Sequence, residues 1–204
     1  MPKVKTTYQS PPSLGRSLLV GALGFGLASL CVFSTVAFAE RWMYARLGLA
    51  GAYLAWTALF ILLGGGALGA LARGRWRRPK FYLLFGAAFF AYAVGWVGAY
   101  FVLRGAAGEW VGSLAGSLLM GAVFAAGFGA AREALNLAGV LFVANSVGYF
   151  VGSALNGWVG GPVGMLLWGV AYGLGLGAGL GAALHLAQRT RAGGAAAGND
   201  PSGP

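Results

Sequence analysis

The chain has 204 residues, of which 58% are hydrophobic and only 9% are charged, whereas a soluble domain carries about 25% charged residues. This composition excludes an ordinary soluble fold, because too few polar side chains remain to cover its core. The formal charge is +10, but the basic residues gather between apolar stretches instead of interleaving with aromatic residues on one polar face. Nucleic acid is therefore not the expected partner.

Six apolar stretches follow one another along the chain, each near the length of about 20 residues that a helix needs to cross a bilayer. Charges fall between these stretches or at their ends, since a charge at the bilayer centre costs a few kcal/mol. The sequence therefore predicts an all-α, polytopic bundle of six transmembrane helices. Their predicted ranges are 17–39, 47–72, 81–103, 110–131, 134–156 and 162–187.

The two ends of the chain lack apolar periodicity, so residues 1–16 and 188–204 are expected to be flexible tails. A second interpretation of the first span stays open, because Ala37-Phe38-Ala39 before Glu40 resembles a signal-peptidase site. The apolar region before it has about 20 residues, longer than the apolar part of a usual signal peptide. This length favours a first span that is not cleaved off.

Positive charge is distributed unequally over the two sides of the predicted bundle. One side has only Arg41, Arg46 and Arg104. Under the positive-inside rule the richer side is cytoplasmic, so both termini are expected in the cytoplasm and the chain in the cell inner (plasma) membrane. The richer side has eleven positive residues: Lys3, Lys5, Arg16, Arg73, Arg75, Arg77, Arg78, Lys80, Arg132, Arg189 and Arg191.

The basic run between the second and third spans comprises Arg73, Arg75, Arg77, Arg78 and Lys80. Each such charge near an anionic leaflet is worth about 1 kcal/mol. The run is therefore a candidate site for acidic lipid headgroups, with the alternative that it only sets the orientation of the chain.

Small residues recur at every fourth position in the last four spans. Helices in lipid associate through close backbone contact, and residues four apart share one face. We therefore expect close packing through a glycine zipper in the sixth span and a shorter stripe in the fifth. These stripes are also candidate contacts for a membrane protein partner or a second copy. The residues are Gly169, Gly173, Gly177 and Gly181 in the sixth span, and Gly148 and Gly152 in the fifth.

The third and fifth spans resemble one another at an offset of 53 residues. Gly86, Phe89, Ala91, Val94 and Gly95 match Gly139, Phe142, Ala144, Val147 and Gly148. Both spans would run in the same direction, as in parallel repeats about an axis along the membrane normal. The match predicts a weak internal repeat of this kind.

Polar and aromatic side chains follow helical spacing on these two spans. If the two helices face a common axis, the side chains line one cleft at membrane depth, where amides, hydroxyls and rings bind a polar solute. In the alternative, the same groups only form hydrogen bonds between helices. The candidate substrate-binding residues are Tyr92, Trp96 and Tyr100 in the third span, and Asn145, Tyr149, Ser153 and Asn156 in the fifth.

Catalytic chemistry is not expected, because no acid lies within a predicted span and the single Cys31 and single His185 belong to different spans. No catalytic residue, metal site or cofactor is predicted. The predicted function is a small permease, or a membrane substrate-binding subunit, for an uncharged or weakly polar solute. An assembly subunit of a larger membrane complex is the alternative, and a passive channel is a third class. A transporter should keep a cavity between the third and fifth spans, whereas an assembly subunit should fill it and expose a glycine stripe.

Overall fold

A computed structural model describes residues 12–72 and 78–197, and every regular element in these ranges is a helix. Five of the helices are long and apolar enough to cross a membrane, which points to a membrane protein. Two short 3₁₀ helices follow α1 and α3. In chain order the elements are α1 (Leu14–Leu68), η1 (Gly69–Leu71), α2 (Arg78–Leu103), α3 (Gly105–Phe128), η2 (Ala131–Glu133), α4 (Ala134–Val159) and α5 (Gly161–Ala197).

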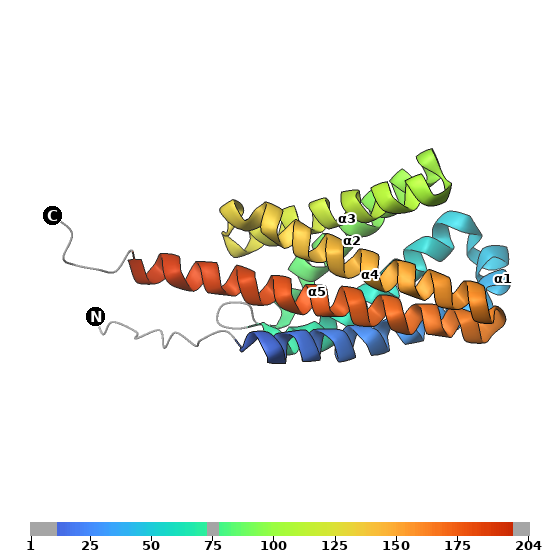
Figure 1. Cartoon of the computed structure of the whole chain (residues 1–204), viewed down its shortest axis with the longest axis horizontal. Coiled ribbons are helices and arrows are strands. Elements are labelled where there is room, and N and C mark those ends of the chain that lie inside the picture. Colours follow the sequence, from blue (N-terminus) through green and yellow to red (C-terminus); the bar gives the residue numbers. More distant parts are fainter. Residues whose placement is uncertain (1–11, 73–77, 198–204) are drawn as a thin grey trace.

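Helix α1 is bent back on itself at Gly48. The backbone there has φ 67° and ψ 178°, a combination that glycine adopts easily and other residues do not. Its two arms lie side by side: the Phe25 and Phe60 rings stack with centroids 5.4 Å apart, and Trp56 Nε1 donates to Thr35 Oγ1 at 3.0 Å. Figure 1 places the bend at the right-hand end of the molecule.

The charged gap expected at 40–46 is helical, so the separator predicted there is wrong in position. Glutamate and arginine are good helix formers, and Arg41 and Arg46 are exposed on the helix surface. These two charged groups can therefore reach a polar environment from a helix, and no loop is required at this position. The break comes two residues after Arg46, at Gly48, where the backbone leaves helical geometry.

The chain runs back and forth between two ends of the bundle (Figure 1). At one end, called here the terminal end, α1 and α2 begin, α3 is joined to α4, and α5 stops. At the other, the bend end, lie the turn at Gly48, the junction at Arg104 between α2 and α3, and the turn at Gly160 between α4 and α5. Helix α5 continues past the predicted end at 187 to Ala197, through an alanine-rich segment with no proline before Pro201.

Part of the predicted lipid-binding run lies outside the described residues, as do residues 1–11 and 198–204. The missing members of the run are Arg73, Arg75 and Arg77. Of the others, Arg78 is the first residue of α2 and Lys80 is exposed in its first turn.

The α5 stripe lies against the first arm of α1. A Cβ added at Gly177 would meet the carbonyl oxygen of Gly21 and, at 2.9 Å, the Cβ of Phe25. One added at Gly181 would meet the carbonyl oxygen of Ser17. The backbones of the two helices are therefore in direct contact along this face, and α1 covers it.

Helices α4 and α5 also approach closely through small residues. A Cβ added at Gly148 would lie 2.8 Å from the carbonyl oxygen of Ala171, and one added at Gly152 would lie 2.9 Å from that of Trp168. Such approach strengthens dispersion contacts between helices that gain little from hiding apolar surface in lipid. Helix α5 is therefore packed between α1 and α4.

Phenylalanine side chains fill the interior between the terminal end and the middle of the bundle. Neighbouring ring centroids are 6.0 Å apart for Phe81 and Phe85, 5.8 Å for Phe85 and Phe89, and 5.2 Å for Phe89 and Phe60. Phe25 stacks on Phe60 from the first arm of α1. These five rings, called here the phenylalanine column, are at most 8% exposed.

Candidate functional site

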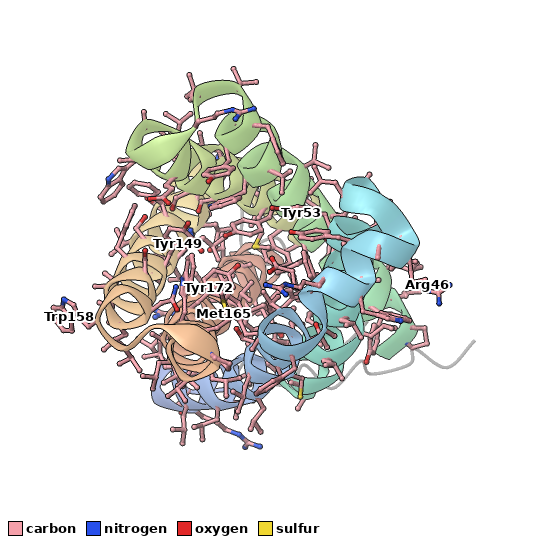
Figure 2. The ribbon with its side chains drawn as sticks, turned by 90° about the vertical axis from the view of Figure 1, so that its right-hand side faces the viewer. Arg46, Tyr53, Tyr149, Trp158, Met165 and Tyr172 are labelled. Carbon is pink, nitrogen blue, oxygen red and sulfur yellow. The ribbon has the colours of Figure 1, made fainter. Side chains whose placement is uncertain are left out.

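A cavity of about 320 Å³ lies inside the bundle, in the half nearer the bend end. Helices α1, α2, α4 and α5 line it, and most of its wall is aromatic. Figure 2 shows Tyr53, Tyr149, Met165 and Tyr172 within the ring of helices, viewed from the bend end. The floor is formed by Phe60 and Phe89, where the phenylalanine column begins.

Three of the seven predicted substrate-binding residues line this cavity, namely Tyr92, Trp96 and Tyr149. The rings of Trp96 and Tyr149 lie 5.5 Å apart, so α2 and α4 face one another as the common-axis hypothesis requires. Tyr92 and Tyr149 are both buried. These three residues place an aromatic face from each helix on the same space.

The other predicted residues lie around the cavity without lining it. Tyr100 stacks on Trp96, with centroids 5.3 Å apart and ring planes 15° apart, and thereby supports a wall residue from behind. Ser153 and Asn156 are half-buried farther along α4. The carbonyl oxygen of Asn156 accepts a hydrogen bond from the Gly160 amide at 2.8 Å, where α4 ends.

Asn145 is fully buried and belongs to a hydrogen-bond network that joins four helices. Its Oδ1 accepts from the Tyr92 hydroxyl at 2.8 Å, and its Nδ2 donates to Ser113 Oγ at 2.7 Å. Ser113 Oγ lies 2.8 Å from Ser146 Oγ, and the Tyr92 hydroxyl lies 3.2 Å from that of Tyr172. Asn145 thus connects helices, as the alternative interpretation of the polar face predicts, and its contact with a substrate stays a prediction.

The network bears on the predicted internal repeat. Tyr92 and Asn145 are separated by 53 residues, the offset of the repeat, and they bond directly to each other. Residues near a twofold axis contact their own counterparts, so this bond lies where such an axis would pass. The repeat itself stays a prediction.

Much of the wall comes from helices that sequence reasoning did not associate with the site. The second arm of α1 contributes Tyr53, Trp56 and Phe60, and α5 contributes Trp168 and Tyr172. Spacings of three and four residues place each set on one helical face, so a signal was present in the sequence. On α5 the glycine stripe lies on the face that packs on α1.

Two carboxyl groups lie at the bend end of the site. Glu40 is half-buried and lines the cavity. Glu109, at the start of α3, accepts a hydrogen bond from the hydroxyl of the wall residue Tyr149 at 3.2 Å. None of the described residues that line the cavity is basic, and Figure 2 shows Arg46 pointing away from the centre.

Two indole nitrogens of the wall have no hydrogen-bond partner within the described part of the chain. They are Trp96 Nε1 and Trp168 Nε1, and both atoms are buried. Buried donors without an acceptor are rare and destabilising in native proteins. The wall thus includes two donors that the protein itself leaves unused.

Comparisons of the chain with protein-family models, with curated proteins and with solved structures gave no match.

Proposed function

We propose that the chain is a multi-pass protein of the inner (plasma) membrane that crosses it six times, with both ends of the chain in the cytoplasm. Helix α1 has 55 residues, which as a straight helix would extend about 80 Å, whereas the hydrocarbon core is about 30 Å thick. The bend at Gly48 divides α1 into two arms, each long enough for one crossing. The denser positive charge of the terminal end supports a cytoplasmic position for it under the positive-inside rule.

Within this bundle the cavity binds a small solute, and the chain acts as a permease or as the substrate-binding membrane subunit of a transporter. The observation that carries this proposal is an unfilled space of about 320 Å³, within the range of about 300–1,000 Å³ typical of small-molecule sites. Its wall is apolar with a few polar groups, which suits a solute with an apolar body and limited polarity.

The alternative is an assembly subunit that uses its surface to bind a membrane protein partner or a second copy. The glycine stripe of α5 is not available for this role, because α1 covers it. A groove of about 430 Å³ between α1, α4 and α5 remains on the outer surface, lined by Leu18, Gly139, Val143 and Ala182 among others. That groove is the surface that favours the second function.

A cavity-filling substitution tests the solute-binding proposal. Ala93 lines the cavity, so Ala93→Phe places a ring in the space. Ala87 is on the exposed face of the same helix, so Ala87→Phe adds the same ring to the surface. The full chain, purified in detergent, is screened by thermal shift against a panel of small neutral, cationic and anionic organic solutes.

We expect at least one solute class to raise the melting temperature of the wild type and of Ala87→Phe, with little effect on Ala93→Phe. The same solute should enter proteoliposomes if the chain is a permease on its own. A panel without any stabilising solute, or stabilisation that Ala93→Phe leaves intact, would contradict solute binding in this cavity.

A further inference from the structure

We infer that the solute held in this cavity is a small organic cation, either a quaternary ammonium or a protonated amine. The inference rests on the proposed solute-binding function and names the chemical class of the solute. It comes from one juxtaposition: the cavity has a mostly aromatic wall, and among the described residues that line it the only charged one is the carboxylic acid Glu40.

The aromatic rings are arranged as walls at right angles. Trp56 lies edge-to-face with both Tyr44 and Tyr53, at interplanar angles of 76° in each case. On the other side Tyr149 and Trp168 meet at 68°, with centroids 5.3 Å apart. Perpendicular rings around one space present π faces from several directions, which is how aromatic cages hold quaternary ammonium groups.

Tryptophan offers the strongest cation–π attraction of the aromatic side chains. Three of the chain's seven tryptophans, Trp56, Trp96 and Trp168, are in this wall. Simple packing in lipid does not require this concentration, because leucine and phenylalanine fill space equally well. The phenylalanine column beside the cavity fills its space with phenylalanine and without tryptophan.

The charges around the cavity favour a cation over the other solute classes. Glu40 is in the wall, and Glu109 is one hydrogen bond away through Tyr149. Together they are two of the four acidic residues of the chain. The arginines of the bend end, Arg41, Arg46 and Arg104, are exposed. An anion would be repelled by this arrangement, and a neutral solute would leave the wall carboxyl without a counter-charge.

The cation must also be organic. Hard metal ions need six or more oxygen ligands at short distance, and an aromatic wall cannot supply them. Alkylated ammonium groups lose less hydration on entering an apolar space, and their bulk matches a cavity of this size. The expectation of an uncharged solute followed from the amide and hydroxyl groups predicted for the cleft, whereas the structure brings Glu40 from the edge of a predicted span into the wall.

Choline and the neutral alcohol in which carbon replaces its nitrogen form a matched pair of probes, equal in shape and different in charge. Binding of each to the purified full chain is measured by isothermal titration calorimetry. Glu40→Gln removes the wall charge, and Glu133→Gln removes the same charge in η2, at the terminal end.

We expect choline to bind at least about tenfold more tightly than the neutral alcohol. Glu40→Gln should weaken choline about tenfold and leave the alcohol unchanged, and Glu133→Gln should change neither. The comparison of the two probes on the wild type does not depend on the folding of any variant.

Equal affinity of the two probes would overturn the cation assignment, and so would choline binding that Glu40→Gln does not weaken. If Ala93→Phe still abolished binding in these cases, the proposed solute site would stand. Absence of choline binding would also overturn the inference, and the proposed function would fall with it only if the solute panel gave no ligand either.

Discussion

At Gly177, α5 lies so close to α1 that a hydrogen atom occupies the space that a methyl group would need. The obstacles are the carbonyl oxygen of Gly21 and the Cβ of Phe25, both on a helix held by its own packing. Backbone atoms of a packed helix cannot rotate aside as a long side chain can. The small residue at this position is therefore a requirement of the contact between the two helices.

We predict that Gly177→Val destabilises the protein by about 1–3 kcal/mol through overpacking, which lowers the melting temperature by about 5 °C. The control is Gly98→Val on α2, where an added Cβ has no atom within 4 Å. Thermal unfolding in detergent measures both. A loss of stability as large in the control would show that valine itself, and not the contact, is responsible.

Asn145 is the other residue whose surroundings determine its role. It is 0% exposed, donates to Ser113 and accepts from Tyr92. Removing one member of a buried polar network leaves its partners without bonds in a medium of low dielectric. Removal of the Asn145 side chain is therefore expected to lower the unfolding free energy by more than the loss of a single surface hydrogen bond does.

We predict that Asn145→Leu lowers the unfolding free energy by about 1–3 kcal/mol, because Ser113 and Tyr92 each lose a partner. Ser153→Ala on the same helix is the control, since Ser153 is half-buried and outside the network. Its effect should be less than about 0.5 kcal/mol. Equal effects in reversible unfolding experiments would contradict a special role for Asn145.

Among the elements, α1 determines the architecture because its two arms bring distant parts of the sequence together. A straight α1 would separate positions 24 and 67 by about 65 Å. In the structure a Cβ added at Gly24 lies 2.7 Å from the Cβ of Ala67. The bend therefore places the start of the chain beside the end of the same element.

A disulfide between these positions tests the bend. In a Cys31→Ala background, the pair Gly24→Cys and Ala67→Cys should form an intramolecular disulfide under mild oxidation. The control pair, Gly24→Cys with Gly98→Cys, should stay reduced, because Gly98 is near the bend end of α2. Thiol labelling followed by mass spectrometry counts the free cysteines, and two free thiols in the first pair would contradict the bend.

The sequence predicted the helical class well, because apolar runs bounded by charge reflect the cost of placing charge in lipid. It located the break in α1 less well, since charges can sit on an exposed helix, whereas the backbone geometry at Gly48 leaves no periodic signal. Helical spacing identified Tyr92, Trp96 and Tyr149, which are on one face of α2 or α4. It could not identify Tyr53 or Trp168 as their neighbours, because spacing within a helix does not reveal which helices pack together.

At the scale of the whole molecule, the two ends differ in charge. The bend end has Arg41, Arg46 and Arg104 with the acids Glu40 and Glu109, which nearly balance. The described part of the terminal end has Arg16, Arg78, Lys80, Arg132, Arg189 and Arg191 with a single acid, Glu133. This difference is the basis of the proposed orientation, with the terminal end in the cytoplasm under the positive-inside rule.

The orientation predicts how single cysteines react with a membrane-impermeant maleimide added to intact cells or spheroplasts. In the Cys31→Ala background, Arg46→Cys should be labelled and Arg132→Cys should not, because the proposed orientation has the bend end outside the cell. After permeabilisation both should be labelled, which controls for reactivity. Labelling of Arg132→Cys alone in intact cells would mean that the bundle is inserted the other way round.

The phenylalanine column has a consequence for what could pass through the bundle. Phe60 and Phe89 line the cavity, and the rings of Phe25, Phe85 and Phe81 continue from there toward the terminal end with 0% exposure. Tightly packed rings leave no room for a continuous file of water, and such a file is what protons and sodium need to pass. Under the proposed function, a solute that crossed the bundle would therefore have to move these rings aside, and the path would close again behind it.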